Sequence, residues 1–73
     1  MKLPQISGRE LIKILRRKGF VVVRQKGSHI RLEKNTDLTT IKVTIPDHKV
    51  LKKGTLHQII KVTDLKEEDF YLK

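Results

Sequence analysis

Residues 27–34 read Gly-Ser-His-Ile-Arg-Leu-Glu-Lys, a short turn followed by side chains that alternate between polar and apolar. An alternation with a period of two is typical of a β-strand that buries only one of its faces. Ile30 and Leu32 are therefore predicted to point into a core, and His29 and Arg31 to point to the opposite, open face. The fold must then cover one side of a sheet and leave its other side accessible.

Apolar segments on either side of this strand predict two further strands. Residues 20–24 read Phe-Val-Val-Val-Arg and are rich in β-branched and aromatic side chains. Residues 41–45 alternate again before a proline ends the strand, and the polar residues 35–40 form the connecting loop. The same alternation places Lys42 and Thr44 on the open face.

The segment before the first strand predicts an amphipathic helix. Residues 7–10 form a capping box, in which the Ser7 hydroxyl accepts from the amide of Glu10 and the Glu10 carboxylate accepts from the amide of Ser7. Gly19 is placed to end the helix in a left-handed conformation. One side of the helix is apolar and the other is basic. The basic side presents Arg9, Lys13, Arg16 and Arg17.

The last third of the chain predicts one more helix and a short helical turn. Residues 55–62 carry an apolar stripe and begin with Thr-Leu-His-Gln, a second capping box. Residues 66–71 predict a last turn, capped by Thr63 or Asp64, and the Phe-Tyr-Leu sequence at residues 70–72 is expected to dock on the body of the protein.

The order α-β-β-β-α predicts one α+β domain over residues 1–73. We expect a two-layer sandwich, with a three-stranded antiparallel sheet, helices on one face and a short C-terminal helix. Each strand is expected to bury one apolar face. The uncovered face of the sheet is the predicted working surface.

Charge is the strongest signal in the composition. The chain has 17 Lys and Arg residues against 8 Asp and Glu, a formal net charge of +9. Residues 1–34 carry ten basic and two acidic side chains, whereas residues 64–73 carry two basic and four acidic ones. Such a field favours phosphate-rich partners, with an affinity that falls steeply with salt. The alternative is a charged surface that is merely well solvated.

Several classes of protein find no support in the sequence. There is no cysteine, and the three histidines are scattered, so we predict no disulfide, no metal site and no cofactor. No apolar run approaches the roughly 20 residues of a membrane span. Residues 1–4 lack the apolar core of a signal peptide. We therefore expect a cytoplasmic protein that does not contact a membrane.

His29 follows a turn and has Arg24, Lys26 and Arg31 close to it in the sequence. RNA carries its own nucleophile, the ribose 2′-hydroxyl. Its cleavage needs a base for that proton, positive charge for the pentavalent phosphorane, and a proton donor for the leaving 5′-oxygen. His29 fits the base, and Lys26 and Arg31 fit the charge. A histidine on a strand is also commonly a packing or hydrogen-bonding residue, and the residues alone leave both possibilities open.

Other side chains are candidates for contacts to RNA. Residues 52–55, Lys-Lys-Gly-Thr, precede the second helix, where free amides and the helix dipole favour an anion, although an ordinary helix start is equally compatible. Ser28 is a turn residue or a phosphate contact, and His48 is a phosphate contact or the general acid, for which water is the alternative. The candidate contacts are Arg9, Lys13, Arg16, Arg17, Arg24, Lys26, Ser28, Arg31, Lys42, His48, Lys52, Lys53, Gly54 and Thr55.

Several short motifs, taken in order, resemble the HicA toxin family. They are Lys-Leu-Pro at 2–4, Ser-Gly at 7–8, Lys-Gly-Phe at 18–20, Arg-Gln-Lys-Gly-Ser-His at 24–29, Val-Thr-Ile-Pro at 43–46 followed by His48, and Lys-Gly-Thr-Leu at 53–56 with Ile59 and Ile60. The resemblance covers essentially the whole chain. It departs at residues 62–65, where Val-Thr-Asp-Leu replaces the usual Gly-Leu/Ile-Ser segment.

The resemblance implies a fold like the double-stranded-RNA-binding domain and a toxin that acts as an mRNA interferase. Such an enzyme cleaves single-stranded messenger RNA and is held inactive by a cognate HicB-like antitoxin. The active histidine of the family corresponds to His29, and Lys52 and Lys53 correspond to a basic cluster that grips phosphates. Two other functions use the same surface: a non-catalytic RNA-binding module, and a module that docks an acidic protein.

Overall fold

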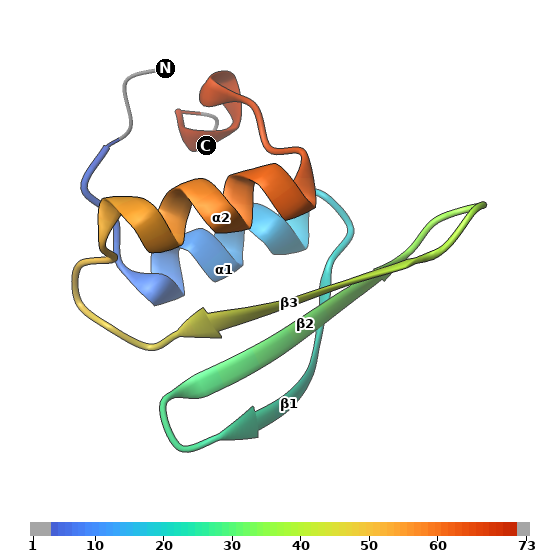
Figure 1. Cartoon of the computed structure of the whole chain (residues 1–73), viewed down its shortest axis with the longest axis horizontal. Coiled ribbons are helices and arrows are strands. Elements are labelled where there is room, and N and C mark those ends of the chain that lie inside the picture. The colour runs from blue at the N-terminus through green and yellow to red at the C-terminus, as the bar shows by residue number, and fades with distance from the viewer. Residues whose placement is uncertain (1–3, 72–73) are drawn as a thin grey trace.

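The computed structural model describes residues 4–71 and has the element order α1–β1–β2–β3–α2–η1 (Figure 1). The helices are α1 (Gly8–Arg17), α2 (Lys53–Thr63) and the 3-10 helix η1 (Glu67–Phe70), and the strands are β1 (Val21–Lys26), β2 (His29–Asn35) and β3 (Thr40–Pro46). The predicted α+β fold is confirmed. Neither α1 nor α2 is long and apolar enough to cross a membrane, within the part of the chain that is described.

The strands form one antiparallel sheet in the order β1-β2-β3, so that β2 is the central strand. The pairing of β2 with β3 runs without interruption along the whole of β2. The pairing of β1 with β2 shifts register between Val22 and Arg24. An extra residue at this point is a β-bulge, which bends the edge strand and increases its twist.

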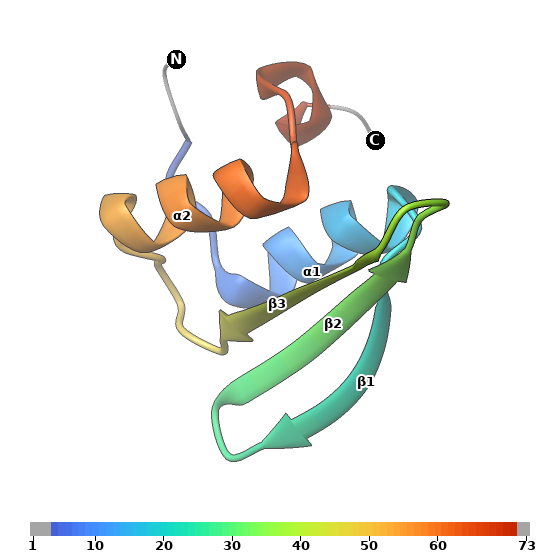
Figure 2. The same cartoon turned by 45° about the vertical axis from the view of Figure 1, so that its right-hand side comes forward.

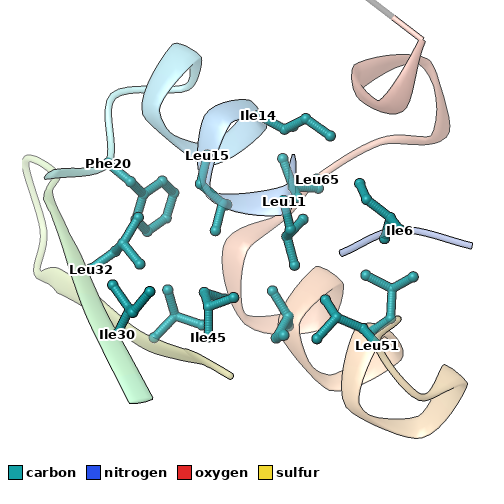
Figure 3. Close-up of a cluster of buried hydrophobic side chains, with 13 residues drawn as sticks. Ile6, Leu11, Ile14, Leu15, Phe20, Ile30, Leu32, Ile45, Leu51 and Leu65 are labelled. Atoms are coloured by element: carbon teal, nitrogen blue, oxygen red, sulfur yellow. The ribbon is translucent and has the colours of Figure 1, made fainter. Parts of the chain in front are cut away.

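Both α-helices lie on one face of the sheet and pack against β3 (Figures 1 and 2). Ile30 and Leu32 of β2 point to this face, as predicted, and Leu32 is completely buried. Figure 3 shows these side chains meeting Leu11 and Leu15 of α1 in one apolar cluster. The complete cluster is Ile6, Leu11, Ile14, Leu15, Phe20, Ile30, Leu32, Val43, Ile45, Leu51, Leu56, Ile59 and Leu65.

The edge strand β1 departs from the prediction that every strand buries one apolar face. All six of its residues are exposed, and Val21, Val22 and Val23 expose 61%, 41% and 49% of their surface. Phe20, immediately before the strand, is the residue of this segment that reaches the core. The cause is position, because β1 lies at the edge of the sheet that is farther from the helices (Figures 1 and 2).

The start of α1 is the capping box that the sequence predicts. The Glu10 amide donates to the Ser7 hydroxyl oxygen over 3.0 Å, and the Ser7 amide donates to the Glu10 carboxylate over 3.3 Å. At the other end the chain leaves the helix through Lys18 and through Gly19, which has a φ of +100°. This part of the prediction is confirmed.

The start of α2 differs from the prediction. The helix begins at Lys53, and its N-cap residue Lys52 makes no side-chain capping bond, so the capping box predicted at residues 55–58 is wrong. The buried Leu51 explains the earlier start. Its amide donates to the carbonyl oxygen of Ile6 over 2.9 Å, which fixes the chain in the core just before the helix.

The C-terminal turn η1 is capped by a residue other than those predicted. Asp69 accepts from the Lys66 amide over 2.8 Å, whereas Asp64 has a left-handed backbone that ends α2. Phe70 packs against the core, but Tyr71 remains 62% exposed, contrary to the expected docking. Leu72, predicted to dock beside them, lies outside the described residues.

Candidate functional site

A two-residue turn delivers His29 to the first position of β2. Lys26 of β1 pairs directly with His29, which leaves Gly27 and Ser28 as the turn. Gly27 has a φ of +59°, and a positive φ at the first turn position belongs to a type of hairpin turn that favours glycine. The side-chain amide of Gln25 donates to the Gly27 carbonyl oxygen over 3.1 Å and further fixes this turn.

Strand pairing gathers the predicted cations around His29. In an antiparallel sheet, residues directly opposite each other point to the same face. Lys26 lies opposite His29, and Arg24 lies opposite Arg31. On the other side of β2, Arg31 lies opposite Thr44. These five residues line one shallow hollow on the face of the sheet that the helices leave open.

The cations of this hollow have no carboxylate partner. The ion pairs within residues 4–71 join Arg9 to Asp47, Lys18 to Asp69 and Lys66 to Asp64. Glu33, a carboxylate on the open face, lies two residues beyond Arg31 on β2, opposite Lys42. The hollow therefore presents uncompensated positive charge to solvent, which suits a phosphate-bearing ligand.

Arg9, a predicted RNA contact, forms an ion pair with Asp47, the residue that follows β3. Its Nε and Nη2 atoms donate to the two carboxylate oxygens over 3.2 and 3.0 Å. The Asp47 amide donates to the carbonyl oxygen of Ser28 over 2.7 Å. The structure thus connects the start of α1 to the turn before His29. Sequence reasoning missed this role of Asp47, because no local pattern pairs residues 38 positions apart.

The other predicted contacts on α1 lie away from the hollow. Arg16 lies near Gly19 and the start of β1, and Lys13 and Arg17 line a surface beside Glu10. Since α1 covers the face of the sheet opposite to His29, the sheet and the core separate these cations from the hollow (Figure 2). A bound RNA reaches both groups only by extending around an edge of the molecule.

Residues 52–55 form the start of α2 and lie at the same end of the molecule as the turn before His29 (Figures 1 and 2). The first turn of α2 has no acidic side chain and no side-chain cap, and both lysines are exposed. Gly54 is exposed, and a Cβ built there meets no other atom within 4 Å. The helix start is open to a phosphate, although the fold itself does not require a glycine there.

The remaining histidines lie outside the hollow. His48 is exposed in the loop between β3 and α2, where its carbonyl oxygen accepts from the Gly8 amide over 2.9 Å. His57 is exposed on the surface of α2. No group of three or more His, Cys, Asp or Glu side chains within residues 4–71 is placed to hold a metal ion.

The fold and the hollow define a small basic α+β protein that displays a histidine among cations on the open face of a sheet. A family model described as the HicA toxin of bacterial toxin-antitoxin matches residues 8–65, from the start of α1 to the residue after the turn that ends α2. The chain belongs to the HicA toxin family. It is therefore a toxin-family protein whose family implies an antitoxin partner, and all the candidate site residues fall inside the match. No curated protein matches the chain.

Proposed function

We propose that this toxin is an endoribonuclease that cleaves single-stranded messenger RNA in the cytoplasm, with His29 as the general base and without a metal ion. The observation that carries the proposal is the position of His29 in a hollow with Arg24, Lys26 and Arg31, none of which has a carboxylate partner within the described residues. A proton acceptor and uncompensated positive charge are the two features that cleavage of RNA by its own 2′-hydroxyl requires.

The reaction is an internal phosphoryl transfer. Neutral His29 takes the proton of a ribose 2′-hydroxyl, and the 2′-oxygen attacks the adjacent phosphorus. The bond from phosphorus to the 5′-oxygen breaks, and that oxygen takes up a proton from His48 or from water. The products are a 2′,3′-cyclic phosphate and a 5′-hydroxyl.

The basic residues divide between the reacting phosphate and its neighbours. Lys26 and Arg31 stabilise the charge that develops on the phosphorane, since one lies opposite His29 and the other lies two residues beyond it. Arg24, Ser28 and Lys42 contact phosphates next to the scissile bond. The start of α2, residues 52–55, binds the backbone farther along, because its amides and lysines are open.

The test is incubation of the purified chain with a long single-stranded RNA in excess EDTA, beside the variants H29A and H57A. The wild type and H57A should cleave, because His57 lies on α2 outside the hollow. H29A should be about 10²–10⁴-fold slower, the usual contribution of a general base. Equal cleavage by H29A and the wild type overturns the mechanism. RNA binding without cleavage by either identifies a non-catalytic RNA-binding module instead.

A further inference from the structure

The edge strand β1 (Val21–Lys26) is exposed along its whole length, and its outer edge has no strand beside it within the described residues. It pairs only with β2, so the amides and carbonyls of its outer edge have no strand partner within the described residues. Its side chains are exposed all along the strand, because both helices pack on the far side of the sheet, against β3. An edge of this kind is a template for pairing with another chain.

The first half of β1 exposes apolar side chains, whereas a solvated edge strand is usually charged. Val21, Val22 and Val23 are consecutive, and each exposes more than 40% of its surface. Val21 pairs with Glu33 of the open face and Val22 pairs with Leu32 of the buried face, while Val23 lies in the bulge. The apolar surface therefore continues around the edge and onto both faces. Contiguous exposed apolar surface on a small protein marks an interaction site.

The chemistry of β1 favours a protein over a nucleic acid as its occupant. Bases stack on aromatic rings, and these three side chains are aliphatic. The rest of the strand is basic, since Arg24 and Lys26 follow the valines and point to the open face beside Arg31 and His29. A second copy of this chain brings the same cations and the same net charge of +9, which opposes self-pairing. A strand that is apolar in one half and acidic in the other complements both halves of β1.

We propose that the antitoxin adds a β-strand to the free edge of β1. The added strand is apolar where it lies against Val21 and Val22, and it carries acidic side chains at alternate positions where it passes Arg24 and Lys26. Those carboxylates neutralise the cations of the hollow and cover His29. Docking at β1 is independent of the chemistry of the site, whereas inhibition by covering His29 rests on the proposed function.

The first experiment measures the affinity of the cognate antitoxin for the chain in an H29A background. V21K and V22K place a charge at the apolar part of the edge. Each should raise the dissociation constant about tenfold, which corresponds to the loss of one buried valine. V50K and V62K are matched controls, because these valines are 56% and 49% exposed and lie outside β1. The controls should change affinity by no more than about twofold.

The second experiment compares amide hydrogen exchange of the unsubstituted chain alone and in complex with the antitoxin. Strand addition should slow exchange at the outward amides of residues 21–26. Protection of residues 40–46 with no change in β1, or a V62K effect as large as that of V22K, overturns the proposal in favour of the β3 edge. Loss of a homodimer in V21K overturns it in favour of a second copy. Neither measurement uses RNA, so a failed cleavage assay does not affect the result.

Discussion

Arg24 of β1 lies directly opposite Arg31 of β2, on the open face of the sheet and two residues along the strands from the pairing of Lys26 with His29. Like charges directly opposite each other destabilise a sheet, by roughly 0.2–1 kcal/mol. Neither arginine has a carboxylate partner within the described residues to offset this cost. In the function that we propose, a phosphate of the RNA supplies the missing negative charge, so binding should stabilise the protein at this point.

Replacing Arg24 by glutamine should therefore have opposite effects on stability and on binding. At low ionic strength R24Q should raise the free energy of unfolding by about 0.5 kcal/mol, because it removes the repulsion. It should weaken RNA binding and lower the salt dependence of log K by about one unit of slope. Urea unfolding and RNA titrations at several salt concentrations measure the two effects. K61Q, on α2, removes one positive charge as well and should leave the slope of log K for RNA binding against log salt nearly unchanged. An equal effect of the two variants on this slope would contradict a localised site.

The close approach of α1 to the end of β3 predicts a specific requirement at Gly8. A Cβ on this residue would overlap the carbonyl oxygen of Pro46, and the Gly8 amide is already bonded to the carbonyl oxygen of His48. G8A should lower the free energy of unfolding by about 1–3 kcal/mol, the usual cost of overpacking. G54A is the matched control, because nothing lies within 4 Å of its Cβ and alanine favours a helix, so it should stabilise by up to about 1 kcal/mol. Denaturant unfolding of both variants measures the difference, and equal shifts would refute this close approach.

The local patterns of the sequence predict the elements of this fold well, because their causes are local. The capping box of Ser7 and Glu10 and the alternation of Ile30 and Leu32 each depend on residues within a few positions of one another. The same alternation predicts the open face that carries His29. The periodicity of apolar residues is therefore sufficient to predict the two layers of the sandwich.

Features that depend on distant parts of the chain were not predictable in this way. The valines of β1 have the composition of a buried strand, and only the placement of both helices over β3 leaves them exposed. The start of α2 is set by the contact of Leu51 with Ile6, which overrides the capping preference of Thr55. Asp47 and Asp69 find their basic partners across long stretches of sequence, and no spacing rule identifies such pairs.

Asp69 predicts how stability depends on pH. Its side chain is 4% exposed, and the bond from the Lys66 amide, with Lys18 also near, holds the pKa of this carboxyl below its ordinary value of 3.8, although burial acts in the opposite direction. A lowered pKa means that the ionised form stabilises the folded state. That contribution is complete above the ordinary value and is lost as the pH falls through the lowered one.

The substitution D69N should therefore flatten the acid side of the stability profile. It should cost about 1 kcal/mol at neutral pH, the net value of a typical hydrogen bond, and this deficit should shrink as the wild type is acidified below pH 3.8. Thermal unfolding across this range measures both curves. D64N is the control, because the Asp64 side chain is 84% exposed and its pair with Lys66 is screened by solvent. Parallel curves for D69N and the wild type would show that Asp69 does not cause the acid sensitivity.

The pairing of Arg9 with Asp47 predicts an effect on cleavage that exceeds its effect on stability. The pair is solvent-accessible, with side-chain exposures of 69% and 28%, so its rupture in R9Q should cost no more than about 1 kcal/mol. Asp47, however, also donates its amide to Ser28, directly before His29. Loosening this contact displaces the base from the 2′-hydroxyl, so R9Q should lower kcat more than it raises KM, if His29 acts as we propose. Single-turnover cleavage with R9Q, D47N and the double variant measures the coupling of the two residues. K66Q breaks a more exposed ion pair, with side-chain exposures of 62% and 84%, far from the hollow, and it should leave kcat unchanged. A loss of kcat in K66Q equal to that in R9Q would show that the Arg9 pair has no special role.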